Sequence, residues 1–367
     1  VVPNFCGPSY TVQNPYADAE ICMNWYVEQM EMPGAKAQYV LNPTPGFETF
    51  GTVAQSPCRG LFATGELTNR VFGVFGFKLY EFSSAGTATD RGDVDNDSLP
   101  VSFAPNSTAG GQMMVASGGT LYVYDLAANT LTAISALSSV PISQVVYLAN
   151  RFIALDATAS AYYWSDINDG ATWSLGQKTV RSTAADPWIA MQVVLGQLWL
   201  TGTLTSDVYY PTADPNDPYQ PIPGALLEQG CAAAFSLVNV DSTLVWLSQN
   251  ANGKGMVQRS NGYTPQRIST HAVEFAIEGY ERIDDAVAFS YQQQGHSFCV
   301  LNFPTAEATW VFDTSTGLWH QRGYWDTSNS EFTRYRAQYA CQAFGLNLVG
   351  DPETGTIYSL TPESSED

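Results

Sequence analysis

The sequence predicts an all-β protein, a seven-bladed β-propeller of four-stranded antiparallel blades closed by an N-terminal strand. Three observations lead to this prediction. A hairpin-rich unit recurs seven times along the 367 residues. The composition, with 13% aromatic and only 14% charged residues, suits pleated and half-buried strands. A segment near the N-terminus can supply the one strand that the last unit lacks.

The repeated unit is clearest at residues 308–323, ATWVFDTSTGLWHQRG, where the turn TSTG separates two apolar strands. Gly317 can adopt the positive φ that such a turn needs. Upstream, residues 286–303 form two alternating runs divided by a Gln/Gly turn. The segment therefore predicts a four-stranded meander of about 40 residues, the size of one propeller blade.

The elements follow one another in a simple order. Residues 1–43 are expected to form an N-terminal arm, mostly loop with one short helix-compatible run. Residues 44–53 are expected to supply the closing strand, which buries edges that would otherwise aggregate. The propeller is then predicted over residues 44–362, and an acidic, frayed tail over residues 363–367. Its blades are expected near residues 59–95, 100–137, 143–180, 187–224, 231–268, 285–323 and 334–362, the last completed by residues 44–53.

The interval before the sixth unit is longer and contains residues 269–285, STHAVEFAIEGYERIDD. Ser269 or Thr270 can cap a helix here. The apolar residues recur at a helical period, at Ala272, Phe275, Ala276 and Tyr280. We predict a short helix that packs against a blade edge, with partner binding as the alternative. For the whole fold, a β-sandwich or a barrel of irregular meanders is the alternative, because the repeats are degenerate.

The formal charge is −20, from 35 acidic and 15 basic residues, and no basic run occurs. Tight binding to nucleic acid needs Lys and Arg to replace counterions on phosphates. This composition excludes a protein that grips DNA and is compatible with a wall that DNA slides past. No signal peptide is seen, and no membrane insertion is expected, because the apolar runs are far shorter than the ~20 residues of a spanning helix.

The six cysteines are dispersed and form no CxxC pair: Cys6, Cys22, Cys58, Cys231, Cys299 and Cys341. Such a pattern is typical of reduced, buried thiols in a protein that folds in the cytosol. A disulfide between Cys6 and Cys22 is the alternative.

Motifs for catalysis are missing. The histidines, His271, His296 and His320, fall in different units without metal-ligand spacing. No HExxH, GxSxG, P-loop or dinucleotide motif occurs. The sequence therefore predicts no catalytic residues, no cofactor and no enzyme activity.

One acidic loop is a candidate ion site. Within DRGDVDNDS, residues 90–98, the carboxylates of Asp93, Asp95 and Asp97 alternate as in a calcium loop. Ser98 stands where such a loop needs Gly, and no downstream Glu follows. We expect a solvated loop rather than a metal site.

A glycan-binding or glycoside-hydrolase-like propeller acting on host polysaccharide is the alternative function. Residues 166–173, DINDGATW, nearly match the Asp-box hairpin of sialidase-like propellers, with Asn168 replacing the key Asp. Even an intact Asp box stabilises a turn and is not catalytic. Aromatic residues could form a sugar platform, but their recurrence at matching blade positions favours packing between blades; these are Trp164, Trp173, Trp199, Trp246, Trp310, Trp319 and Trp325.

Several stretches resemble one family, the packaged-DNA stabilisation proteins of short-tailed bacteriophages, which are tail-hub or nozzle proteins. The most specific stretches are NGYTPQRISTHAVEFAI (residues 261–277) and YQQQGHSFCVLNFPTAEATWVFDTSTGLWHQRG (residues 291–323). GPSYTVQNPYADAEICMNWYVE, PTPGFETF, RGLF, GCAAAFSLVNVDSTLVWLS and NLVGDPETGTIYSL add to the resemblance, which extends from about Gly7 to Leu360.

The resemblance implies a structural role without catalytic residues. Members form a homo-oligomeric ring, typically of six copies, beneath the portal and adaptor. They extend the tail tube, hold back packaged DNA, let DNA pass without specific binding, and provide a platform for fibres, spikes or a needle. The expected location is the virion tail, after synthesis and assembly in the bacterial cytoplasm. Family members usually carry a further β-rich segment after the last blade, which the 367 residues do not include.

Overall fold

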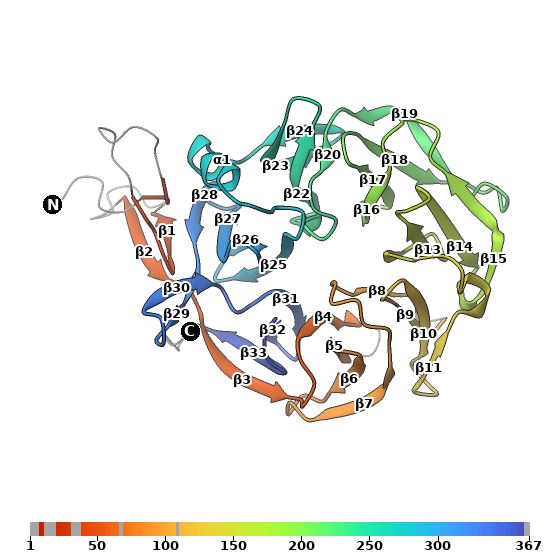
Figure 1. Cartoon of the computed structure of the whole chain (residues 1–367), viewed down its shortest axis with the longest axis horizontal. Helices are drawn as coiled ribbons and strands as arrows, with labels where there is room; N and C mark the ends of the chain where they lie inside the picture. Colours follow the sequence, from red (N-terminus) through yellow and green to blue (C-terminus); the bar gives the residue numbers. More distant parts are fainter. Residues whose placement is uncertain (1–6, 11–19, 31–37, 66–68, 108–109, 363–367) are drawn as a thin grey trace.

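The computed structural model describes residues 7–10, 20–30, 38–65, 69–107 and 110–362. Seven antiparallel sheets surround a central axis, each with its first strand nearest the axis (Figure 1). This arrangement confirms the predicted seven-bladed propeller. The predicted tail, residues 363–367, lies outside the described residues.

Blades one to four are regular meanders whose strands are numbered from the axis outward. Blade one contains β4 (Cys58–Ala63), β5 (Val71–Phe75), β6 (Lys78–Phe82) and β7 (Ala88–Asp93). Blade two contains β8 (Ser102–Pro105), β9 (Gln112–Ser117), β10 (Thr120–Asp125) and β11 (Thr130–Ala133), followed by the 3-10 helix η2 (Ser135–Leu137). Blade three contains β12 (Gln144–Leu148), β13 (Arg151–Asp156), β14 (Ala161–Asp166) and β15 (Asp169–Val180). Blade four contains β16 (Trp188–Val194), β17 (Gln197–Gly202), β18 (Ser206–Pro211) and β19 (Tyr219–Leu227).

Blades five to seven vary this plan. In blade five the inner strand is split into β20 (Gly230–Cys231) and β21 (Val238–Val240), which both pair with β22 (Thr243–Asn250); β23 (Gly253–Asn261) and β24 (Thr264–Arg267) follow. Blade six contains β25 (Val287–Gln293), β26 (His296–Phe303), β27 (Ala308–Asp313) and β28 (Leu318–Gln321). Blade seven contains β31 (Tyr339–Ala343), β32 (Leu346–Gly350), β33 (Thr356–Thr361) and, outermost, β3 (Gly46–Thr52).

Strand β3 closes the ring, as the sequence predicts. It pairs antiparallel with β33, Gly46 opposite Thr361 and Thr52 opposite Thr356. The ring of Phe47 stacks on Tyr335 and Tyr358, with centroids 5.0 and 4.9 Å apart. The first and last parts of the propeller are therefore held in one sheet.

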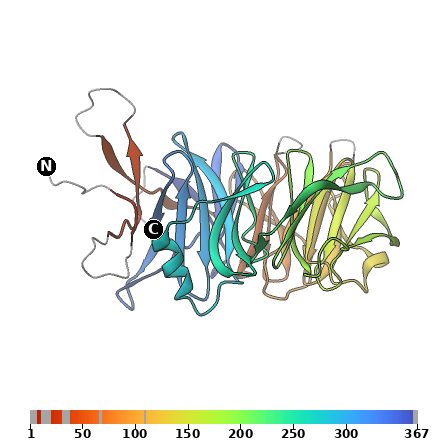
Figure 2. The ribbon, with the colours of Figure 1, turned by 90° about the horizontal axis from the view of Figure 1, so that it is seen from above.

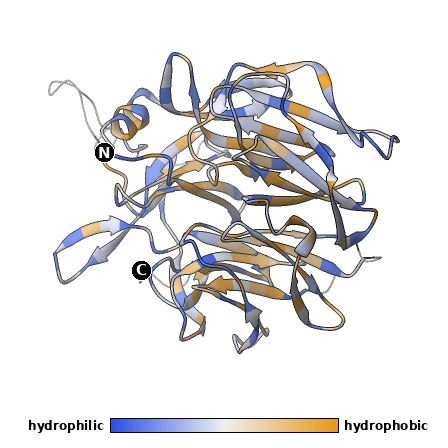
Figure 3. Ribbon diagram, turned by 45° about the vertical axis from the view of Figure 1, so that its right-hand side comes forward, coloured by the Kyte–Doolittle hydropathy of each residue, from blue (hydrophilic) through white to orange (hydrophobic). Residues whose placement is uncertain are grey.

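The core of the described part of the chain consists of seven apolar clusters, one between each pair of neighbouring blades. The cluster between blades seven and one joins Leu348 and Ile357 to Phe75 and Phe82. Hydrophobic residues accordingly follow the strands, while the turns are mostly hydrophilic (Figure 3). Each blade therefore buries its faces against two neighbours, and closure of the ring leaves no blade with an uncovered apolar face.

The N-terminal arm differs from the prediction. In the described part of the arm, where the sequence predicts mostly loop, β1 (Trp25–Gln29) and β2 (Tyr39–Pro43) form an antiparallel hairpin beside blade six. The run WYV consists of strong strand formers, and Tyr26 buries its ring against His296 and Phe298. A second hairpin, β29 (Gly323–Asp326) and β30 (Glu331–Arg334), lies between blades six and seven and was not predicted.

The predicted helix is present as α1 (His271–Glu278), with Thr270 as its N-cap, accepting a hydrogen bond from the Val273 backbone N–H. Its buried side chains are Ala272, Val273 and Ile277. Phe275, one of the residues at the helical period, is 40% exposed. None of the helices in the described residues is long and apolar enough to span a membrane.

Gly317 has φ +72°, which confirms the turn that the sequence predicts, and a Cβ at this position would have no heavy atom within 4 Å. We expect Gly317→Val to lower the free energy of unfolding by about 1–3 kcal/mol, because a β-branched residue resists positive φ. Gly253→Val is the matched control, since Gly253 also faces open space and lacks a positive φ. Equal losses for both variants in urea unfolding would contradict the turn assignment.

Candidate functional site

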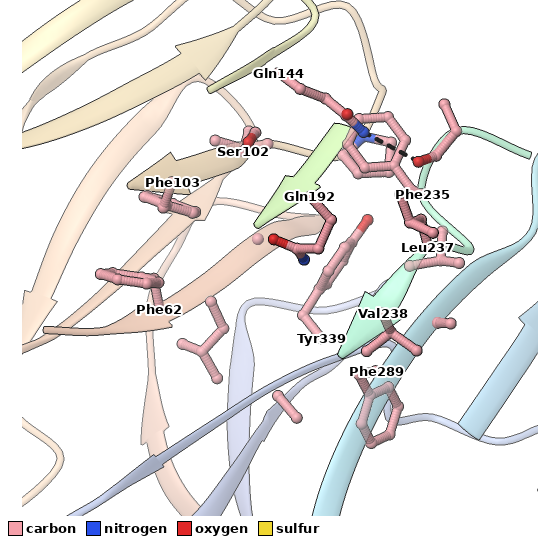
Figure 4. Close-up of a pocket in the computed structure, with 18 of the residues that line it drawn as sticks. Phe62, Ser102, Phe103, Gln144, Gln192, Phe235, Leu237, Val238, Phe289 and Tyr339 are labelled. Atoms are coloured by element: carbon pink, nitrogen blue, oxygen red, sulfur yellow. Dashed lines mark hydrogen bonds between the residues drawn. The ribbon is translucent and has the colours of Figure 1, made fainter. Parts of the chain in front are cut away.

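The axis of the propeller is the first candidate site. The inner strands of all seven blades line a cavity of about 320 Å³ (Figure 4). Its wall carries aromatic and aliphatic groups together with a few amides and hydroxyls, among them Phe62, Phe103, Phe235, Phe289, Gln192 and Tyr339. None of the lining side chains is charged.

The polar groups at the axis mostly hold blades together. The Gln144 amide donates to the Ala234 carbonyl oxygen at 3.0 Å and accepts from the Met191 backbone N–H at 2.7 Å, so it joins blades three, four and five (Figure 4). Gln338 donates to the Tyr339 hydroxyl at 3.0 Å. Burial raises the pKa of that hydroxyl, which keeps it neutral.

Hydrolysis of glycosides needs two carboxyl groups that flank the scissile bond, about 5–9.5 Å apart. The axial cavity contains no carboxylate. A neighbouring cavity of about 310 Å³ between blades five, six and seven contains one, Asp241. Burial raises the pKa of Asp241, but hydrogen bonds from Ser297, Thr314 and Gln292 outweigh this and hold it below its usual range. Asp241 thus joins blades five and six through hydrogen bonds. The lining of this cavity contains no second carboxylate.

The three carboxylates of the candidate ion loop make separate contacts. Asp93 pairs with Lys78 at 2.9 Å, and Asp97 pairs with the buried Arg59 at 2.6 Å. Asp95 accepts a hydrogen bond from the Thr120 hydroxyl at 2.5 Å. Among the residues that the structure describes, no group of three His, Cys, Asp or Glu side chains could hold a metal ion.

The histidines do not meet at a site either. His271 is exposed at the start of α1, whereas His296 and His320 are buried in blade six. The His296 Nδ1 lies 2.7 Å from an Asp313 carboxylate oxygen, and His320 lies beside the buried Arg322. Burial, and then the charges of Arg322 and His296, lower the pKa of His320 well below its usual value.

This lowered pKa gives the fold a pH dependence. Below about pH 6.5 an unfolded histidine binds a proton that folded His320 does not accept, so acid favours the unfolded chain. The contribution of His320 to the free energy of unfolding is fully present above about pH 6.5. It decreases by about 1.4 kcal/mol for each pH unit below that value.

We expect His320→Gln to flatten the slope of the free energy of unfolding against pH between about pH 6.5 and 5.5. The substitution of the exposed His271, His271→Gln, is expected to leave that slope unchanged. Identical slopes for both variants would refute this origin.

The Asp-box-like hairpin stabilises a turn. The carboxylate of Asp169, rather than Asn168, accepts hydrogen bonds from the Ala171 N–H and the Thr172 hydroxyl at 2.8 and 2.7 Å. The indole of Trp173 donates to the Gly170 carbonyl at 2.7 Å. The side chain of Asn168 instead accepts from the Tyr147 hydroxyl at 2.8 Å. The hydrogen bonds of this hairpin therefore stabilise its turn, and they provide no catalytic group.

Six of the seven tryptophans considered as a sugar platform pack between blades, as predicted. Six are buried: Trp164, Trp173, Trp199, Trp246, Trp310 and Trp319. Trp325, on the second unpredicted hairpin, is 46% exposed, so packing was the wrong interpretation for it. In the sequence, Trp325 lies in an alternating run next to the polar turn DTSNS, and this pattern is typical of an exposed hairpin.

The described cysteines include three buried free thiols, Cys58, Cys231 and Cys299, and the half-buried thiol of Cys341. Burial raises the pKa of Cys299 and Cys341 to about 12, so these thiols stay protonated and unreactive. Cys6 lies outside the described residues, and the Cys6–Cys22 disulfide remains an alternative.

Comparison with known proteins shows which protein family the chain matches. A family model described as Bacteriophage P22 Gp10, beta-propeller, matches residues 10–365. No curated protein matches the chain significantly.

Several solved structures share the fold at low identity. Virginiamycin B lyase from Staphylococcus aureus has a TM-score of 0.57 at 9% identity, over 86% of this chain and 98% of the lyase. A chain of the mitotic checkpoint complex has a TM-score of 0.52 at 12% identity, over 91% of this chain and 98% of its own length. The N-terminal domain of Nup159 has a TM-score of 0.50 at 11% identity, over 94% and 99%. These similarities show the propeller fold alone.

Proposed function

The chain belongs to the phage stabilisation family described as Bacteriophage P22 Gp10, beta-propeller, and from this membership we propose that it is a structural protein of the virion tail. As part of the tail hub or nozzle it extends the tail tube, helps to retain packaged DNA and docks other tail proteins. The match over residues 10–365 is the observation that carries the proposal.

The geometry of the axis bears on how DNA passes. The cavity at the axis has a volume of about 320 Å³. A DNA duplex is far larger, since its major groove alone is about 12 Å wide. DNA therefore does not thread a single propeller. The proposal places it in the lumen of a ring of copies, six in number, with the propellers around it.

The charge of the chain supports passage without specific binding. With a formal charge of −20 and 15 basic residues, the surface has little capacity to replace counterions on phosphates. A wall that bound phosphates at every step would slow DNA ejection. In the proposed role the partners are further copies of the chain, the portal and adaptor, and fibres, spikes or a needle.

Particles assembled without this chain test the role in DNA retention. We expect such heads to fill with DNA and then lose it, so that DNase treatment degrades most of the genome. Supplying the chain in trans restores protected DNA and infectivity. Depleted particles that keep their DNA and infect normally would contradict the proposal.

A further inference from the structure

The cavity that contains Asp241 lies at one face of the disc, next to the propeller axis. Seen from the edge, the strands run from one face to the other, and the turns that join them lie at the faces (Figure 2). The cavity of about 310 Å³ is bounded by the turn between β21 and β22 and by the inner strands β25 and β31. It adjoins the axial cavity, because Ser290 and Ala340 line both. Its volume is at the lower end of the range for small-molecule pockets, ~300–1,000 Å³.

The lining of this cavity, which we call the polar cavity, combines hydrogen-bond donors and acceptors. Among the described residues that line it, none is a lysine, an arginine or a histidine. An amide side chain offers both an N–H donor and a carbonyl acceptor, and a hydroxyl can do both. Four amides, two hydroxyls and one carboxylate belong to the lining: Asn239, Gln292, Gln342, Asn347, Ser290, Ser297 and Asp241.

Several of these groups have hydrogen-bonding capacity that the fold does not use. The exposed side-chain amides of Asn239 and Gln342 make no hydrogen bond to any residue that the structure describes. The Gln292 amide donates to Asp241 at 3.2 Å, and the Asn347 amide donates to the Gln292 backbone carbonyl at 2.9 Å. These two contacts leave the side-chain oxygens of Gln292 and Asn347 available. A ligand could therefore bind at four amides without breaking a contact of the fold.

The carboxylate of Asp241 is fixed in place before any ligand arrives. It accepts hydrogen bonds from the Ser297 and Thr314 hydroxyls at 2.7 and 2.8 Å, besides the bond from Gln292. An ionised carboxylate offers about four acceptor sites, so one remains for a ligand. The backbone of Asp241 has φ +49°, a left-handed conformation that aspartate tolerates in turns. Such preorganisation reduces the entropy that binding costs.

The chemistry of the lining restricts the class of ligand. An anionic group would meet the charge of Asp241 without a compensating cation, in a chain of formal charge −20. An apolar ligand would cover the free amides and leave them unpaired, which costs free energy. The described residues also offer no group of three His, Cys, Asp or Glu side chains for a metal ion. A neutral molecule with several hydroxyls fits best, because each hydroxyl both donates and accepts.

We propose that the polar cavity binds a neutral saccharide through its hydroxyl groups. The sugar hydroxyls donate to Asp241 and to the free oxygens of Gln292 and Asn347. They accept from the amide N–H groups of Asn239 and Gln342. The sugar is bound and not cleaved, because hydrolysis of a glycoside needs a second carboxyl group and the lining has one. This inference goes beyond the proposed structural role and does not depend on it.

Titration calorimetry of the full chain with matched sugars tests the site. The probes are D-glucose, D-galactose and D-mannose, each compared with its uronic acid, which has a carboxylate in place of the terminal CH₂OH group. D-glucosamine, an ammonium cation, is an added probe. The site variant combines Asn239→Ala with Gln342→Ala. The control combines Asn216→Ala with Gln266→Ala, which remove exposed amides outside the cavity. Circular dichroism and thermal melting verify the folding of both variants.

We expect at least one of the three hexoses to bind the unaltered chain and the control with equal affinity. The site variant is expected to bind that hexose about tenfold more weakly or worse, because two hydrogen-bonding amides are lost. The corresponding uronic acid is expected to bind the unaltered chain about tenfold more weakly than the hexose or worse, because its carboxylate is placed near that of Asp241.

The inference is overturned if none of the hexoses binds at the highest concentration used, or if the uronic acids bind as tightly as the hexoses. Equal affinities of the site variant and the control would place the sugar elsewhere and also overturn it. Binding of D-glucosamine without binding of D-glucose would assign the cavity to an ammonium group instead. Each of these results would leave the DNA-retention result, and so the proposed function, unchanged.

Discussion

A chain that begins at Ala54, and therefore lacks β3, is expected to lose its cooperative unfolding transition. Deletion removes the outer strand of blade seven, exposes the edge of β33 and uncovers the rings of Tyr335 and Tyr358, on which Phe47 stacks. The loss is expected to be roughly 5 kcal/mol or more, comparable with the whole stability of many domains. Thermal melting and binding of a hydrophobic dye measure it.

A circular permutant provides the matched control for this deletion. Gly46 lies opposite Thr361, so a short turn can join the end of β33 to residues 44–53 and make β3 the last strand of an ordinary meander. This chain also begins at Ala54 and differs from the deletion by the closing strand alone. We expect it to melt cooperatively. A deletion that is as stable as the permutant would show that the strand does not close the ring.

The second large effect is expected for Trp310→Ala, with a loss of about 3–5 kcal/mol in the free energy of unfolding. Trp310 is fully buried between blades five and six. Its indole N–H donates to the Tyr280 hydroxyl at 2.9 Å, and its ring packs edge to face against Trp319. Truncation leaves a cavity and removes the partner of a half-buried hydroxyl.

Trp325→Ala is the comparison, because the same residue type is there half exposed on a hairpin outside the blades. We expect this variant to lose less than about 1 kcal/mol in urea unfolding of the monomer. Similar losses for both variants would contradict the assignment of blade and hairpin.

The repeating part of the fold could be predicted because turn chemistry and strand alternation are local. Gly317 takes the positive φ that its place between two apolar strands requires. The closing strand could also be predicted, since the last unit has three strands and a free edge. Residues 44–53 contain the missing strand, observed at Gly46–Thr52.

The two projecting hairpins could not be predicted from the repeat, because β1–β2 precedes the first blade and β29–β30 lies between the sixth and the seventh. Residues 25–29 and 39–43 contain strand formers, but they lie outside the regular spacing. The exposed face of α1 shows a similar limit. The helical period of the apolar residues predicts the helix, but it does not predict which of them are buried. Val273 and Ile277 are buried, and Phe275 is not.

The role of the loop carboxylates also depended on distant residues. Asp97 meets Arg59, which lies 38 positions earlier in the chain, and no pattern within the loop indicates that contact. No catalytic motif occurs in the sequence, and the described cavities contain no pair of carboxylates. The proposed function therefore rests on the family match over residues 10–365 and not on a pattern of residues within the chain.

Cryo-electron microscopy of purified virions, with a reconstruction centred on the tail, is the decisive test of the structural role. We expect seven-bladed discs of this chain arranged as a ring around the tail tube, with DNA passing through the lumen of the ring. A tail that contains no such discs, or DNA density along the axis of a single propeller, would refute that role.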